Sequence, residues 1–89
     1  MYSTYMIIAF SSTHQAIHFE RLLLLKYEIE LIPTPREVSA SCGLSLKFET
    51  EDLPEILKEL ENEDKTGLQL LEFVINEGGQ KVVNMGWGA

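Results

Sequence analysis

Several residue types that would point to common functions are scarce in this chain. Cys42 is the only cysteine, so no internal disulfide can form, and the sulfur can act only as a nucleophile, a ligand or a carrier. His14 and His18 are the only histidines, which leaves too few soft ligands for a zinc site. We therefore expect neither a metal nor another cofactor.

Basic residues are also few. Seven lysines and arginines stand against fourteen acidic residues, which gives a formal net charge of -7. Such a chain is repelled by phosphate backbones and by anionic lipid surfaces. We expect no nucleic-acid partner. Much of the acidity lies between residues 49 and 63, and a solvated helix face explains that pattern.

Long apolar runs are missing as well. The longest apolar runs, at 5–10 and 22–25, are far shorter than the roughly 20 apolar residues that cross a membrane. The first residues lead directly into an apolar strand, without the basic region and cleavage site of a secretory signal. No membrane association is expected. The cytoplasm is the expected compartment, in agreement with an unpaired thiol.

The length and the hydrophobic content, 89 residues and 45%, fit one small domain. We expect a single domain over 1–89, with 68–89 as a C-terminal hairpin extension. Apolar spacing predicts two helices, the first from the hydroxyl residues at 11–13 to about Tyr27 and the second after Thr50, which would cap it. Strands are expected at 5–10, 29–32, 44–48, 70–76 and 81–85, with a turn at 77–80.

This order of elements predicts the fold class. Strand, helix, strand, strand, helix, strand and one extra strand indicate an α+β fold, the ferredoxin-like split βαββαβ sandwich. In it an antiparallel sheet carries two helices on one face. Other small α+β sandwiches remain alternatives.

The same topology places the thiol. The first two strands of this arrangement run parallel, with the third between them, so both loops that follow them leave the sheet at one edge. Cys42 should then face the amino-terminal end of the first helix, where free amide groups favour a thiolate. The residues expected to stabilise or approach this sulfur are Ser11, Ser12, Thr13, His14, Arg36, Ser39, Ser41 and Gly43.

Each of these residues also has a simpler interpretation. A single cysteine beside a strand is often a buried small apolar residue. The hydroxyl residues at 11–13 are explained by helix capping alone, His14 by a surface position on the first turn of the helix, and Arg36 by capping a turn or pairing with the neighbours of Glu37. Cysteine hydrolase chemistry would need an oriented base and a deep cleft, which a domain of this size is not expected to offer. These residues therefore favour a carrier protein over a true enzyme.

Two segments resemble a known family. They are Tyr-Met-Ile-Ile-Ala-Phe-Ser-Ser-Thr at 5–13, followed by Ala16 and Glu20, and Ile-Pro-Thr-Pro-Arg-Glu-Val-Ser-Ala-Ser-Cys-Gly at 32–43. Over about the first sixty residues the chain resembles the small family of selenium or sulfur carrier proteins, long catalogued as a domain of unknown function. The resemblance implies a carrier that holds sulfur or selenium on Cys42 as a persulfide or its selenium analogue.

From this we expect a relay between sulfur or selenium donor and acceptor proteins. The alternative is a noncatalytic interaction module in which Cys42 only packs. The chain departs from the family's pattern in its tail, which continues through Gly78 and Gly79 to Trp87. This extra strand would either cover a sheet edge or form a homodimer contact, with Trp87 on the sheet or against a neighbouring subunit.

Overall fold

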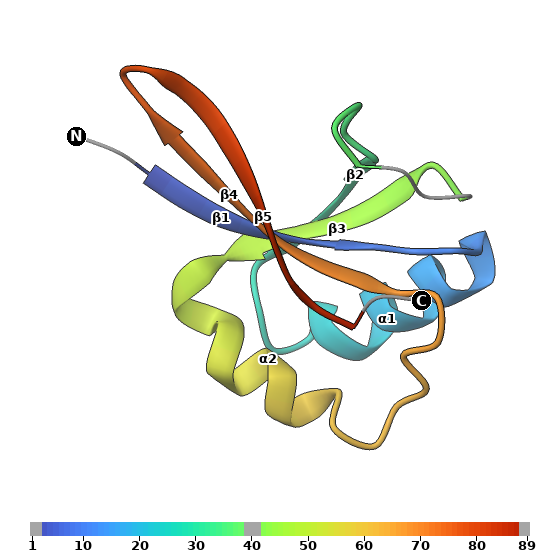
Figure 1. Ribbon diagram of the computed structural model, residues 1–89. Helices are drawn as coiled ribbons and strands as arrows, with labels where there is room; N and C mark the ends of the chain where they lie inside the picture. Colours follow the sequence, from blue (N-terminus) through green and yellow to red (C-terminus); the bar gives the residue numbers. More distant parts are fainter. Residues whose placement is uncertain (1–2, 39–41, 88–89) are drawn as a thin grey trace.

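The computed structural model of the chain describes residues 3–38 and 42–87, and Figure 1 shows its elements. In chain order these are β1 (Ser3–Ala9), α1 (Thr13–Leu24), β2 (Ile29–Pro33), β3 (Leu44–Glu49), a 3₁₀ turn (Thr50–Asp52), α2 (Leu53–Glu59), β4 (Gln69–Asn76) and β5 (Gly79–Gly86).

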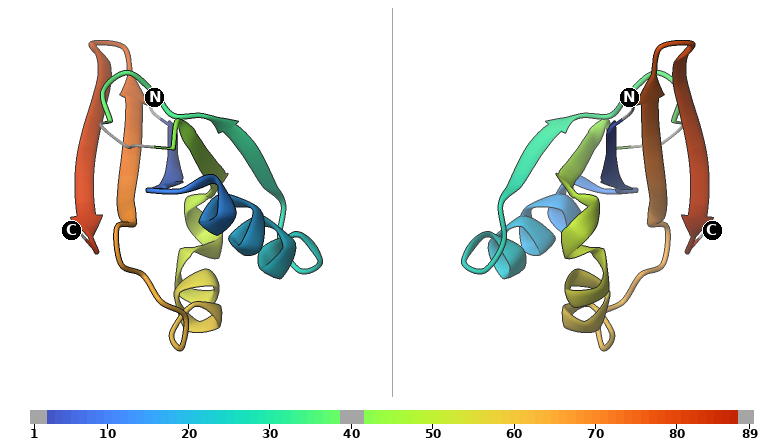
Figure 2. Two further views of the ribbon diagram at one scale, coloured as in Figure 1. Left: turned by 90° about the vertical axis from the view of Figure 1, so that its right-hand side faces the viewer. Right: turned by 90° about the vertical axis from the view of Figure 1, so that its left-hand side faces the viewer.

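The strands form one sheet in the order β2-β3-β1-β4-β5, and every neighbouring pair is antiparallel. Because β1 and β2 both pair antiparallel with β3, they run parallel to each other. Both helices lie on the same face of the sheet (Figure 2). The α+β prediction is confirmed, and the strand order is the one that the split arrangement requires, with β5 added beside β4. That β5 mediates a homodimer stays a prediction.

The core between sheet and helices comes from alternating residues of the strands. Met6, Ile8 and Phe10 point toward the helices from β1 and its end, as period-two geometry dictates. They pack against Phe19 of α1 and Ile56 of α2, all in one cluster of buried residues that we call the helix-face cluster. This cluster joins both helices to the sheet.

A second buried cluster lies on the opposite face. Its members are Ile7, Ala9, Val38, Leu71 and Phe73, which we call the open-face cluster. The β1 run is apolar on both sides because both of its faces are covered.

Ser45 shows the effect of this cover. The alternation of Leu44, Leu46 and Phe48 with polar residues is typical of a strand with one solvent-facing side, but Ser45 on that side is completely buried. It pairs with Ala9 and Ile32, whose side chains belong to or pack against the open-face cluster, and its hydroxyl lies 2.8 Å from that of Thr34. The hydrogen bond explains how a polar side chain is tolerated in the interior.

Helix α1 begins as the sequence predicts and ends earlier than predicted. Ser12 caps it, with its Oγ accepting a hydrogen bond from the backbone amide of Gln15 at 3.2 Å. The last helical residue is Leu24, where Tyr27 was expected, because the chain then turns toward β2. The following Leu25 is 91% exposed and adds nothing to the apolar stripe.

Thr50 does not cap the second helix, so that prediction is wrong. Its hydroxyl lies 2.8 Å from the Thr4 hydroxyl of β1, and the chain passes through a 3₁₀ turn before α2 begins at Leu53. No side chain makes a capping hydrogen bond at the start of the 3₁₀ turn or at the start of α2. Pro54 is tolerated because it lies in the first turn of α2, where no amide donor is required.

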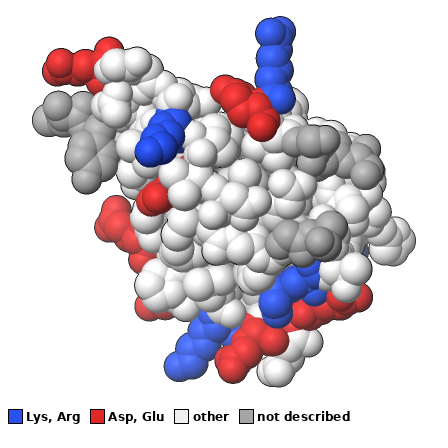
Figure 3. Space-filling model, in the orientation of Figure 1, with Lys and Arg blue, Asp and Glu red and all other residues white. Residues whose placement is uncertain are grey.

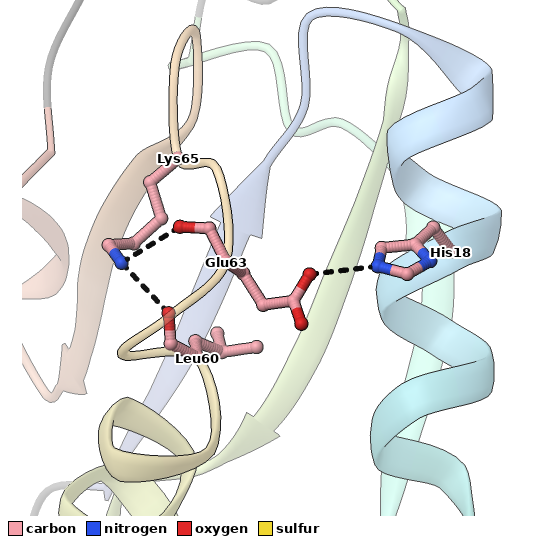
Figure 4. Close-up of polar contacts among 4 residues, drawn as sticks. All are labelled: His18, Leu60, Glu63 and Lys65. Carbon is pink, nitrogen blue, oxygen red and sulfur yellow. Dashed lines mark hydrogen bonds and ion pairs between the residues drawn. The ribbon is translucent and has the colours of Figure 1, made fainter.

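The segment after α2 is tied to its helix and to α1 (Figure 4). The Lys65 ammonium donates to the carbonyls of Leu60, Glu61 and Glu63, at 2.8, 3.3 and 3.2 Å, which lie at and just beyond the end of α2. Glu63 in turn lies 2.9 Å from the His18 ring of α1. These contacts hold the segment 60–68 beside the helix.

Trp87, just beyond β5, packs against the helix-face cluster of its own chain. The Lys65 ammonium lies 6.0 Å from the centroid of its ring, at the outer limit of a cation–π contact. Trp87 therefore packs on the core of its own chain.

Candidate functional site

Cys42 lies directly before β3, at the edge of the sheet where α1 begins. Its side chain is half-buried and packs against the helix-face cluster. Its Sγ is 3.8 Å from the hydroxyl of Thr13, the first residue of α1, although the two residues are 29 positions apart in the chain. The prediction that Cys42 faces the amino-terminal end of this helix is confirmed.

The beginning of α1 favours negative charge. The first amide groups of a helix have no intrahelical acceptor, and the aligned peptide dipoles place about half a positive charge there. Ser12 satisfies the amide of Gln15, and the first turn contains no acidic residue that would oppose an anion. The contact with Thr13 therefore places the sulfur at an electropositive helix end.

Two weak contacts surround the sulfur, and they respond differently to its ionisation. As a thiol, Cys42 can donate to the Leu44 carbonyl, which lies 4.0 Å away. Once the proton leaves, that carbonyl faces an anion and gives no stabilisation, whereas the Thr13 hydroxyl can still donate to the sulfur. The sulfur thus has one acceptor and one hydroxyl beside it.

Ser11 is engaged elsewhere. Its hydroxyl donates to the Gln15 side-chain oxygen at 2.8 Å, and the Gln15 amide nitrogen donates to the Thr66 carbonyl at 3.0 Å. Gly67 lies so near that a Cβ added to it would be 2.5 Å from Ser11 Oγ, and its φ of +80° also favours glycine. Ser11 therefore joins α1 to the segment before β4, and its hydroxyl is already bonded.

His14 and Arg36 are both exposed, and among the contacts of the described residues neither touches Cys42. His14 lines two open hollows together with His18, and Glu63 and Asp64 of the segment after α2 also line one of them. Arg36 lies in the turn that follows Pro35. Their role in stabilising an anion stays a prediction. Ser39 and Ser41 lie outside the described residues.

Gly43 forms the exposed bend between Cys42 and β3. Its φ of +77° is in the left-handed region. Among the described residues other than its two chain neighbours, none would lie within 4 Å of a Cβ added to it. The carbonyl of Gly43 accepts a hydrogen bond from the Thr34 amide at 2.9 Å, which closes the base of the loop.

Thr34 and Ser45 were missed among the predicted site residues. Their hydroxyls meet at 2.8 Å where the end of β2 pairs with the start of β3. A signal was present in the sequence, since Thr34 follows β2 and Ser45 lies one position into β3. Pairing those two strands as a hairpin would have brought the residues together.

Charge is distributed unevenly around the molecule. In the orientation of Figure 1 the charged side chains lie mainly around the border of the visible face, and its centre is uncharged (Figure 3). An open hollow of about 520 Å³ lies between Leu24 and Glu49, at the opposite end of β2 and β3 from Cys42. Within residues 3–38 and 42–87, no three metal-ligating side chains gather and no helix is long and apolar enough to cross a membrane.

We expect Thr13→Val to slow the reaction of Cys42 with a small thiol reagent about fivefold, the equivalent of a hydrogen bond of about 1 kcal/mol. Valine keeps the shape of threonine and loses only the hydroxyl 3.8 Å from Sγ. The measurement is the second-order rate constant at neutral pH. Ser12→Ala is the control, because it removes the helix cap and lowers stability without touching the sulfur. Equal rates in Thr13→Val and wild type would show that the contact has no chemical effect.

Comparisons with known proteins agree with the resemblance seen in the sequence. A family model described as "Putative Se/S carrier protein-like" matches residues 5–74, and so extends past residue 60, where the resemblance was expected to end. A protein of Methanocaldococcus jannaschii, described as uncharacterized, is 32% identical over 67 residues, which are 75% of this chain. The matched part is 34% of that relative's length. No solved structure matches the chain.

Proposed function

The chain belongs to the Se/S carrier protein-like family, and from this premise we propose that it carries one sulfur or selenium atom on Cys42 and relays it between two partner proteins. The observation that supports this most is the position of Cys42 Sγ, 3.8 Å from the first residue of α1. The proposed compartment is the cytoplasm, where thiols remain reduced.

The transfer we propose is an ordinary exchange at sulfur. The Cys42 thiolate attacks the outer sulfur of a persulfide on the donor. A new bond forms between the two sulfurs, the donor's own sulfur–sulfur bond breaks, and its electron pair leaves on the donor thiolate. Cys42 is now a persulfide, which an acceptor thiolate attacks in the same way at the outer atom, releasing the Cys42 thiolate. A selenium atom in the outer position follows the same balance.

The surroundings of Cys42 suit both halves of this exchange. The leaving group of the second half is the Cys42 thiolate, which the Thr13 hydroxyl and the helix end stabilise. The sulfur is half-buried and the neighbouring Gly43 is exposed and lacks a side chain, so an attacking group has a path to it.

The test of this proposal is a loading experiment. The full chain is incubated with a cysteine desulfurase and isotopically labelled cysteine, and its intact mass and peptide map are recorded. We expect a gain equal to one sulfur atom, located on the peptide that contains Cys42 and removed by a reducing thiol. A desulfurase that loads a known acceptor in the same tube while this chain gains nothing would contradict the proposal.

A second candidate is an interaction module in which Cys42 only packs. One observation favours it, namely that the side chain contacts the helix-face cluster. The two readings differ in reactivity: a carrier thiol reacts with a small reagent in the native protein, whereas a packing thiol reacts only when the protein unfolds. Comparing the rates with and without denaturant separates the two.

A further inference from the structure

Two leucines at the end of α1 are the most exposed large apolar side chains in the described part of the chain. Leu24 is 56% exposed and Leu25 is 91% exposed. In Figure 2 the turn that follows them, between α1 and β2, lies at the outer side of the molecule, away from β5. Single exposed apolar residues are common, but neighbouring ones beside a hollow are typical of an interaction surface.

The hollow of about 520 Å³ extends from Leu24 over the start of β2. Tyr27 and Ile29 line it, and both also pack against the helix-face cluster, so its floor is apolar and fixed to the core. Tyr27 borders a second open hollow, of about 400 Å³, against α2. We give the name Tyr27 surface to Leu24, Leu25 and the residues that line these two hollows.

Carboxylates surround the apolar part of the Tyr27 surface. Those that line the two hollows are Glu28, Glu30, Glu49, Glu55 and Glu59. The lysines nearby balance them only in part. Lys26 is already bonded to Glu59, with 2.7 Å between Nζ and Oε1, and the Lys47 ammonium lies 4.8 Å from the centroid of the Tyr5 ring. The surface therefore has an excess of negative charge.

The Tyr27 phenol senses this excess. Desolvation raises the pKa of the phenol, and the carboxylates of Glu59 and Glu55 raise it further. Lys26 opposes this shift of the pKa, and Asp52 adds to it. Surroundings that disfavour another negative charge attract a positive one, so an ammonium or guanidinium group would be drawn to this surface.

The charge also decides between possible occupants. Two copies of the chain that met symmetrically through this surface would bring like charges together, which disfavours the contact. Nucleic acid and anionic lipid are repelled for the same reason. A cationic segment of another protein, in contrast, gains attraction from the carboxylates while its apolar side chains cover the leucines.

We propose that the Tyr27 surface docks a basic segment of a partner protein, in which lysine or arginine residues flank an apolar side chain. The apolar side chain occupies the hollow between Leu24 and Ile29, and the cationic groups lie against the surrounding carboxylates. Because the hollow is at the opposite end of β2 and β3 from Cys42, a segment bound there does not cover the sulfur. The inference goes beyond the proposed function and does not depend on it.

The experiment uses a short synthetic peptide with blocked ends, in which lysines flank one leucine on each side. It is titrated into the isotopically labelled full chain, and the backbone amide shifts are followed by nuclear magnetic resonance. We expect saturable shifts concentrated at 24–30, 47–49 and 55–59. A peptide with serine in place of the leucine should bind about threefold more weakly. The absence of shifts at about 1 mM peptide would overturn the inference, and so would shifts spread over all acidic segments.

Variants test the contribution of the carboxylates. Glu28→Gln combined with Glu30→Gln should weaken binding of the leucine peptide about fivefold at low salt. Glu37→Gln combined with Glu61→Gln is the matched control, because it removes the same charge from two exposed residues that line neither hollow. This control should match wild type within about twofold. Equal losses in the two double variants would mean that the peptide senses only net charge, contrary to the proposal.

A second pair of variants tests the apolar contact. Leu24→Ala should weaken binding about threefold, whereas Ile17→Ala, at another exposed apolar position of α1, should leave it unchanged. Equal effects of these two substitutions would contradict a docking site at the end of α1. Cys42→Ser should bind the peptide like wild type. Since none of these measurements uses a sulfur donor, a failure of loading contradicts the proposed function alone, and a failure here contradicts only the docking surface.

Discussion

Replacing Cys42 with serine is expected to abolish sulfur loading completely while the fold persists. Serine keeps nearly the same shape next to Thr13 and Leu44, so the packing at this edge of the sheet changes little. Its hydroxyl, however, forms no stable anion at neutral pH and cannot accept a sulfur atom by exchange. The measurement is the intact mass of Cys42→Ser after incubation with the desulfurase and labelled cysteine.

The same variant separates covalent carriage from simple anion binding. The helix end next to Thr13 would attract an anion whether or not a thiol is present. If Cys42→Ser retained labelled sulfur after gel filtration, the cargo would be held without a covalent bond, contrary to the proposal. Circular dichroism and a urea titration of the variant test whether a loss of labelled sulfur is caused by unfolding.

Phe73→Ala is expected to lower the free energy of unfolding by about 3–5 kcal/mol, the usual cost of removing a large buried aromatic side chain. Phe73 is completely buried on the sheet face without helices, where it stacks on Tyr5. A domain of this size has about 5–10 kcal/mol in total, so a large part of its stability would be lost. Urea denaturation followed by circular dichroism measures the change.

Ile75→Ala is the matched control for that experiment. Ile75 lies two residues further along β4, on the same face of the sheet, but it is 37% exposed. Its truncation should cost about 1 kcal/mol or less. If both variants lost the same small amount, the open-face cluster would not be a second core.

Much of the fold could be predicted from short stretches of sequence. Alternation in β3 and three- and four-residue spacing in α1 placed those elements within a few residues. The hydroxyl run at 11–13 located the start of α1, where Ser12 is the cap. Topology then placed Cys42 near that start, because the handedness of the first crossover leaves only one arrangement. Thr13, which contacts Cys42, was among the predicted site residues.

Other features depended on contacts between distant parts of the chain. The sequence around Thr50 looks like a helix cap, but Thr4 from β1 takes its hydroxyl. Ser45 looks like a solvent-facing position, but Thr34 and the open-face cluster enclose it. At both places a contact with a distant strand outweighed the local sequence preference, because that strand offered a better hydrogen bond or excluded water.

The amino-acid order of this protein was enough to specify its helices, its strands and the single thiol beside a helix start, because these follow from spacing, capping and handedness within short segments. Only the folded chain decided that the face without helices is a second core and that Gln80 reaches Glu37. Those pairings join residues tens of positions apart, and no local pattern encodes which of many polar or apolar side chains will meet.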